Sequence, residues 1–498
     1  MAPSRSARWP ARFLAGARRS AFAAVLLLAC ALREPAGAAE RMEGPPPWRI
    51  GGRVGFTLDT CVRPDSSGLS LDILLRVPPA TLAQLSRDDS GEARLLAEVR
   101  VRGRYGARVQ QDSREFRIFP GDSAGGIGRV LVLRFPAASG PCRVTAKLTD
   151  LHSHRPALLP GKPHEQGELS GEFEVPRPQE GRDASQIEFF WPRVGEAQGA
   201  IFERGGRTRV PNPDRLYGLF AEELLAGFEV RGRAGDLRPW HWVARVYDAR
   251  GGGVAQREST ATAGRFLDAE ASFDLSGEPA GGYELEFKAW QEGDAKALMR
   301  RERFSIGWQP DTWLRSAAEA NDEVHFLLES GAEEEFVRMH PGEQEAYLEE
   351  FWRRRDPTPE TALNEALETF RARIRYANAN FTRTGLERGM FSDMGRVYIR
   401  YGEPSEILRQ VIPAGESTLE RQLQQILDTE DRQPTDVQQK GLGGDMRPFE
   451  VWIYEGDIPL PPDADPREEA RGRSRRRLLF LFVDEQGTGI YRLRYSTE

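Results

Sequence analysis

The segment from Phe351 to Pro404, which reads FWRRRDPTPETALNEALETFRARIRYANANFTRTGLERGMFSDMGRVYIRYGEP, decides the fold of the C-terminal part of this chain. Thr358 is a good N-cap, because its hydroxyl can accept a backbone N–H of the first turn, and Pro359 suits the first helical position. This start and the spacing that follows predict a helix of about six turns with one buried side. Its apolar residues recur at alternating steps of four and three, at Leu363, Leu367, Phe370, Ile374, Ala377 and Phe381.

The end of the same segment has a different period. After Asp393 the apolar residues Val397, Ile399 and Tyr401 alternate with polar or charged positions, and this period of two predicts a strand. Gly402 and the residues up to Pro404 predict a turn. The segment therefore predicts a helix docked on a strand.

Several motifs in this region resemble the GWxTD domain family. The pentad that names the family is represented by Gly389 to Asp393, where Met390 stands for Trp and Ser392 stands for Thr. The resemblance covers roughly the last third of the chain and implies an α+β domain and an exported setting, but no particular activity. The residues that carry it include Phe351, Trp352, Arg355, Asp356, Pro357, Thr358, Pro359, Asn364, Glu365, Arg373, Tyr376, Ala377, Asn378, Phe381, Gly389, Asp393 and the run from Gly395 to Pro404.

A set of ionic and amide side chains from this pattern is the candidate functional set. In an open cleft, such carboxylates and guanidiniums would shift one another's pKa values and could support catalysis. In a structural network, Asp356 and Asp393 would instead cap backbone N–H groups, and the arginines would pair with them. We favour the structural role, because the set contains no histidine and no nucleophile–base pair. Its members are Arg355, Asp356, Asn364, Glu365, Arg373, Asp393 and Arg396.

The length, the net charge and the N-terminus indicate the number of domains, the class of partner and the compartment. A chain of 498 residues predicts about three domains, and a net charge of −7 provides no basic surface for nucleic acid. Residues 1–38 predict an export signal, in which arginines precede an apolar run, 21–32, that is too short to span a bilayer. The alternative is a lipidated Cys30, which is the only membrane attachment that we expect. Both predict an exported protein, periplasmic or extracellular.

Cys61 and Cys142 form an even pair outside the signal, in an oxidising compartment. A disulfide between them would close a loop of about 80 residues and stabilise the fold by roughly 4 kcal/mol. The alternative is two buried free thiols that pack as small hydrophobic side chains. The sequence leaves both possibilities open.

Most of the remaining chain predicts strands. Short alternating segments with turn residues between them fill 48–178 and 185–308, which predicts two tandem all-β immunoglobulin-like sandwiches. Residues 140–148 align with 281–289 at an offset of 141 residues, which indicates an internal duplication. Residues 311–498 predict an α+β domain with a small antiparallel sheet, amphipathic helices against one face, and a polar insert at about 410–447.

Three further sequence patterns can be explained without a catalytic, metal-binding or anion-binding role. Residues 121–125 match the Gly-x-Ser-x-Gly elbow of hydrolases, but a strand and not a helix is predicted after them. His152, His154 and His164 lack the spacing of a metal motif. The arginines of 471–477 follow acidic residues, as is typical of a solvated loop. The sequence therefore predicts no metal and no cofactor.

These observations predict a non-catalytic interaction or scaffold protein of the bacterial cell envelope, whose partner is an envelope protein or a cell-surface component. One alternative is an extracytoplasmic, hydrolase-like enzyme that uses Asp356, Glu365 or Asp393. Another is glycan binding by the second sandwich, which requires two or more aromatic rings on one exposed face. The candidate rings are Trp191, Trp240, Trp242 and Trp290.

Overall fold

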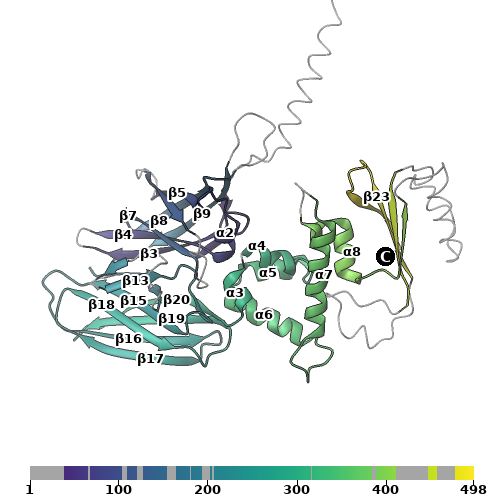
Figure 1. Cartoon of the computed structure of the whole chain (residues 1–498). Coiled ribbons are helices and arrows are strands. Elements are labelled where there is room, and N and C mark those ends of the chain that lie inside the picture. Colours follow the sequence, from purple (N-terminus) through teal and green to yellow (C-terminus); the bar gives the residue numbers. More distant parts are fainter. Residues whose placement is uncertain are drawn as a thin grey trace, which may run out of the picture.

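The structure is a computed structural model, and it describes residues 39–65, 68–103, 109–119, 127–153, 164–179, 181–192, 202–204, 207–315, 317–383, 388–410, 447–456 and 477–497. Strands dominate the described chain and form five sheets. A group of helices lies between four of these sheets and the fifth, which is the C-terminal one (Figure 1). None of the described helices is long and apolar enough to cross a membrane. The predicted export signal with Cys30, residues 121–125, His154, residues 471–476 and most of the predicted insert lie outside the described residues.

Two sheets face each other across one core in residues 40–175, which we call the first sandwich. Alternate residues of each strand point inward, so that Leu58, Ile73 and Leu133 of one sheet meet Val99 and Val144 of the other. The four-stranded sheet contains β2 (Trp48–Ile50), β3 (Phe56–Pro64), β4 (Leu69–Val77) and β7 (Arg129–Ala137). The five-stranded sheet has the order β1 (Glu40–Arg41), β9 (Glu165–Val175), β8 (Gly140–Asp150), β5 (Ala93–Arg102) and β6 (Gln110–Ile118), and the short α2 (Pro79–Gln84) closes one end of the core.

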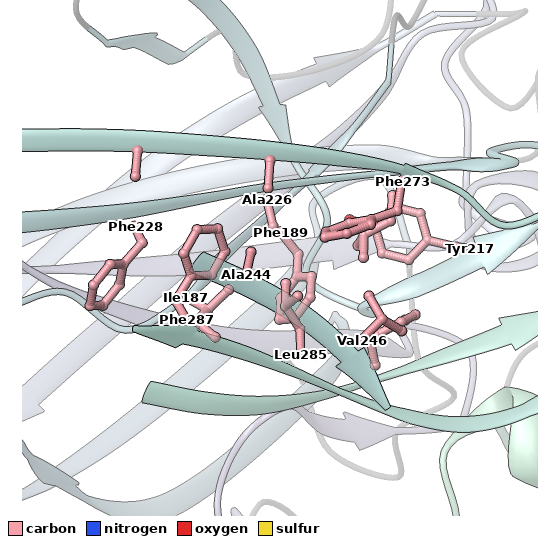
Figure 2. Packing of buried hydrophobic residues seen from close by; sticks show 14 of the residues in the cluster. Ile187, Phe189, Tyr217, Ala226, Phe228, Ala244, Val246, Phe273, Leu285 and Phe287 are labelled. Atoms are coloured by element: carbon pink, nitrogen blue, oxygen red, sulfur yellow. The ribbon is translucent and has the colours of Figure 1, made fainter. Parts of the chain in front are cut away.

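Residues 183–307 form the second sandwich, whose core is richer in aromatic rings. Figure 2 shows Phe228 and Phe189 packed against Ala244, Leu285 and Phe287, and the rings of Phe228 and Phe287 stack with centroids 5.5 Å apart. One sheet contains β10 (Asp183–Ala184), β11 (Glu188–Trp191), β12 (Phe202–Arg204), β13 (Arg207–Pro211), β15 (Glu223–Arg231) and β18 (Phe266–Asp274). The other has the order β14 (Leu216–Gly218), β20 (Leu298–Gly307), β19 (Gly281–Gln291), β16 (Trp240–Asp248) and β17 (Gly253–Ala261).

The two five-stranded sheets share one plan. In each, a short strand runs parallel to a long one, β1 along β9 and β14 along β20, and the remaining neighbours are antiparallel in the same order. The strands aligned by sequence, β8 and β19, occupy equivalent places in this order, and the aligned residues Cys142 and Tyr283 are both buried. The common topology supports the duplication that the sequence indicates.

The two cysteines do not form a disulfide. Both are free and buried, but Cys61 lies on the outer face of the four-stranded sheet, against Leu74 and Val132, whereas Cys142 lies in the core between the sheets. Side chains on opposite faces of a sheet cannot bring their Cβ atoms within the distance of about 4 Å that a disulfide needs. Burial also raises the pKa of Cys142 to about 11, which keeps it a thiol. Of the two possibilities left open by the sequence, the structure therefore has the free thiols.

The C-terminal region places helices between the second sandwich and an antiparallel four-stranded sheet (Figure 1). Strand Leu478–Asp484 is apolar up to Val483 and lies between two other strands of that sheet. The helices are α3 (Pro310–Leu314), α4 (Ala317–Val324), α5 (Ser330–Arg338), α6 (Pro341–Arg353), α7 (Glu365–Phe381), the 3-10 turn η1 (Gly389–Phe391) and α8 (Asp393–Tyr401). The sheet has the order β21 (Glu406–Gln410), β22 (Phe449–Tyr454), β23 (Leu478–Asp484) and β24 (Tyr491–Ser496).

The main helix begins later than predicted. Asn364 is the N-cap of α7, because its side-chain oxygen accepts the N–H of Leu367 while its amide donates to Trp352 O, 2.7 Å away. The hydroxyl of Thr358, the predicted cap, donates instead to Glu365, and Leu363 lies outside the helix and is exposed. The predicted N-cap was wrong because two caps competed, and only Asn364 also satisfies a buried carbonyl.

The predicted strand at 397–401 is also wrong, because these residues belong to α8. Ser392 accepts the N–H of Gly395 at its start, and Gly402 ends it with a φ of 81°. Val397 and Tyr401 pack on the sheet, whereas Ile399 packs against the cluster around α7. The helix is thus buried on two opposite sides, which produces an apolar period close to two.

Candidate functional site

The seven polar residues singled out by the sequence are distributed over separate local contacts. Asp356 accepts the N–H of Thr358, and Glu365 accepts the hydroxyl of the same residue, so both fasten the loop before α7. The guanidinium of Arg355 lies over the ring of Phe351, 3.6 Å from its centroid, and donates to Phe351 O. With Asn364 as the helix cap, these contacts connect the end of α6 to the start of α7.

The remaining members of the set fix α8. Arg373 donates to the carbonyl oxygens of Ile399 and Arg400 at the C-terminal end of α8, both 3.1 Å away. Asp393, in the first turn of α8, accepts the backbone N–H of Leu493 in β24 at 2.9 Å. Arg396 is exposed. None of the seven lines the hollow described below, so the structure does not bring the set together as a site.

The pentad acts through the same contacts. A Cβ on Gly389 would collide with the carbonyl oxygen of Ala377, so η1 lies directly against α7. A Cβ on Gly395 would collide in the same way with the carbonyl oxygen of Gly389. Because Gly389 allows this approach and Asp393 holds β24, the two residues that match the family pattern strictly both serve packing.

A buried ionic cluster lies where the two sandwiches meet, and no motif in the sequence pointed to it. Arg215, which has a φ of 52°, donates two bonds to Asp59 of β3, at 2.8 and 2.9 Å, and one to Glu302 of β20 at 2.7 Å. Burial alone would lower the pKa of Arg215, but Asp59 and Glu302 hold it above its ordinary value. In this cluster the positive and the negative groups are hydrogen-bonded to each other, and these bonds connect the first sandwich to the second.

A second part of this cluster surrounds Asp214. Its carboxylate pairs with Arg76 of β4, and Arg49 of β2 lies 3.7 Å away. Burial acts to raise the pKa of Asp214, but Arg76 and Arg49 together lower it below its ordinary value. Burial also lowers the pKa of His340, the residue that precedes α6, to about 3, and Arg49 and Arg215 act in the same direction. His340 is therefore neutral at physiological pH and is no general acid there.

A hollow lies next to this cluster, where the second sandwich meets α5 and α6. It consists of two adjoining cavities of about 830 and 380 Å³, within the range of ligand sites. Gly342 allows α6 to approach the sandwich, because a Cβ there would collide with Ile306 O. The residues that both cavities share are Asp248, Ala249, Gly282, Tyr283, Arg303 and Glu343.

The carboxylates and the arginines of the hollow differ in how they are bonded. Asp248 Oδ1 accepts the N–H groups of Arg250 and Gly252 in the turn between β16 and β17, at 2.8 and 2.7 Å. Glu343 accepts the N–H of His340 at 2.9 Å. The side chains of Arg250 and Arg303 are exposed, and neither has an ion pair with any described residue. The two guanidiniums are thus without an ion pair among the described residues, while Asp248 and Glu343 bond backbone N–H groups and keep their negative charge.

The wall between these charges is apolar. Tyr283 is buried, donates its hydroxyl to Pro279 O at 2.8 Å and stacks on Phe304. Burial raises the pKa of Tyr283 to about 12, with Glu278 and Asp248 acting in the same direction, so it is no base at neutral pH. The described lining contains no Ser, Thr, Cys, Lys or His. Such a surface can bind a ligand, but it offers none of the usual nucleophile–base pairs.

The other candidates from the sequence form no site in the described structure. Trp191 and Trp240 are buried and Trp242 packs against the core, so the requirement for two exposed rings on one face is not met by them. His164 contacts the carbonyl oxygen of Ser153. Within the described residues, no three His, Cys, Asp or Glu side chains converge as metal ligands.

Comparison with known proteins adds no identification: no family model and no curated protein matches the chain. Among solved structures, the C-terminal domain of wzt is 13% identical with a TM-score of 0.19, over 27% of this chain and 77% of that one. Red sea bream transglutaminase is 9% identical with a TM-score of 0.16, and β-glucuronidase of Parabacteroides merdae is 10% identical with a TM-score of 0.16. They match 51% and 47% of this chain, which spans 31% and 27% of their length. Scores this low carry no argument about function.

Proposed function

We propose that this protein is an exported, non-catalytic binding protein of the bacterial cell envelope. In this proposal two immunoglobulin-like sandwiches carry a GWxTD-like α+β domain, and the assembly contacts an envelope protein or a cell-surface component. One observation carries the non-catalytic part: Asp356, Glu365 and Asp393, the carboxylates that an enzyme would use, each accept a bond from within the chain. Residues that hold the fold in this way do not need a substrate to explain them.

Replacing Asp393 by Ala tests this role. We expect the free energy of unfolding to fall by about 1–2 kcal/mol, because Leu493 loses its acceptor and α8 loses a negative charge in its first turn. Thermal or urea unfolding measures the loss. The matched control is Glu406→Ala, an exposed carboxylate of β21 for which the described structure has no bond, and it should change stability by less than about 0.5 kcal/mol. An Asp393→Ala protein as stable as the wild type would favour the catalytic alternative.

The exported part of the proposal rests on residues 1–38 and is tested separately. We expect the full chain to be recovered from the envelope or periplasmic fraction of a bacterial host, and a chain that begins at residue 39 to stay in the cytoplasm. Substituting Cys30 by Ser then distinguishes a lipid anchor from simple cleavage, because only the loss of an anchor releases the protein from membranes. Recovery of both chains from the cytoplasm would contradict the proposal.

A further inference from the structure

We propose that the far face of the C-terminal sheet, the face turned away from α8, is a binding site for an amphipathic helix, and that residues 417–427 of the same chain occupy it. The buried members of this face are Phe449, Val451, Ile453, Leu479, Leu481, Val483 and Tyr495. Residues 411–446 lie outside the described residues. The inference concerns a contact within the chain, and it does not depend on the proposed function.

The burial of the far face is the first argument. Phe449, Val451 and Leu481 are 0% exposed. Within the described residues, no helix contributes to their hydrophobic cluster, which contains only residues of the four strands, with Leu408 packed against it. The cluster on the opposite face differs, because it includes Val397 of α8. A sheet face without a cover would be solvated, so this burial requires a cover from outside the described residues.

The sequence of residues 417–427 is the second argument. Ser417 and Glu420 match the Ser-x-x-Glu pattern of a capping box, which predicts the start of a helix. The apolar residues that follow share one side of that helix. They are Leu419, Leu423, Ile426 and Leu427. The other undescribed segment between strands of this sheet, 457–476, contains only two residues that are Val, Ile, Leu, Met or aromatic, so it offers no comparable apolar side.

The dimensions of the helix and of the far face agree. Three alternating residues of one strand span about 13 Å, and the eleven residues 417–427 span about 16 Å as a helix. A helix with its side chains is about 10 Å wide, or two strand spacings, so one helix covers β22 and β23. Six residues, 411–416, separate Ser417 from the end of β21, and they can extend over about 20 Å. The segment can therefore reach the middle of the face from the edge strand.

The fluorescence of anilinonaphthalene sulfonate (ANS), a dye that binds exposed apolar surface, tests the cover on the full chain. In the Leu423→Asp, Ile426→Asp double variant we expect the ANS signal to rise about threefold, because carboxylates cannot be buried on an apolar face and the face opens to the dye. The matched control is the Gln424→Asp, Gln425→Asp double variant. It places the same two charges in the same segment but on its polar side, and it should give the wild-type signal.

A peptide added in trans tests whether the opened face is a site for this helix. We expect a fluorescein-labelled peptide of residues 414–430 to bind the Leu423→Asp, Ile426→Asp variant saturably, as measured by fluorescence anisotropy. The wild type should bind the peptide about tenfold more weakly or less, because its own segment occupies the face.

Three outcomes would overturn the inference. It is wrong if the two double variants give the same ANS signal, or if the Leu423→Asp, Ile426→Asp variant does not bind the peptide. A wild-type dimer in sedimentation velocity, together with an unchanged ANS signal in that variant, would assign the cover to a second copy of the chain. If circular dichroism shows that the Asp variant is unfolded, Leu423→Ala, Ile426→Ala replaces it, with a smaller rise of the ANS signal expected and the same peptide test.

Discussion

Replacing Arg215 by Met is expected to destabilise the protein by about 3–5 kcal/mol, the largest effect of a single substitution proposed here. The guanidinium makes bonds of 2.8 and 2.9 Å to Asp59 and of 2.7 Å to Glu302, and its side chain is only 3% exposed. Methionine fills much of the volume but leaves two carboxylates near each other without their cation. The cost is mainly the burial of uncompensated charge.

Equilibrium unfolding in urea at neutral pH measures this loss. The matched control is Arg143→Met, because Arg143 pairs with Glu172 on the surface, where both side chains are 53% exposed. An exposed pair contributes no more than about 1 kcal/mol. Equal losses in the two variants would show that the buried cluster is no more important than a surface pair, and that the fastening of the two sandwiches lies elsewhere.

Replacing His340 by Asn is expected to make the protein more resistant to acid. Burial, with Arg49, Arg215 and Arg303, lowers the pKa of His340 to about 3 in the folded protein, although Asp214 acts in the opposite direction. In the unfolded chain an imidazole titrates near pH 6.5. Between these two values the unfolded chain binds a proton that the folded protein does not, so the free energy of unfolding falls as the pH is lowered through this window.

At pH 4 this imidazole should cost roughly 3 kcal/mol of stability, and nearly all of that cost should be absent at pH 7.5. Asn does not titrate in this range and is a good residue before a helix, so the variant should regain stability at pH 4 and change little at neutral pH. Urea unfolding at both pH values measures the difference. His241→Asn, which removes an imidazole stacked on Trp290 away from the junction, is the control. Parallel pH profiles for the wild type and His340→Asn would show this explanation to be wrong.

The strands of the two sandwiches were predicted better than the helices of the C-terminal region. Inward residues such as Val144 and Leu285 repeat every second position, so the paired sheets follow from local patterning. Helix α8 was predicted as a strand because Val397 and Ile399 are buried on different sides, and a single sequence does not reveal how many partners an element has. The late start of α7 depends on Trp352 O, a partner twelve residues away from Asn364.

The candidate site was less accessible to prediction for a related reason. Asp356, Glu365 and Asp393 stand out in the sequence because they belong to a recognisable pattern, yet each accepts a hydrogen bond from within the chain. Arg303 looks in sequence like any polar residue of an alternating strand, and Arg250 like any turn residue. What distinguishes them is the absence of an ion pair with described neighbours beside a hollow, and this emerges only when α6 is placed against β19 and β20.

The double burial of α8 has a consequence for how the C-terminal region opens. Because Val397 holds the sheet and Ile399 holds the helices, neither layer can detach without exposing one side of α8 to water. The backbone amides of α8 should therefore exchange with solvent hydrogen as slowly as those of β23, as members of one cooperative unit. A force applied to the last strand, β24, would then be transmitted through α8 to α7, and would not simply detach the edge strand from the sheet.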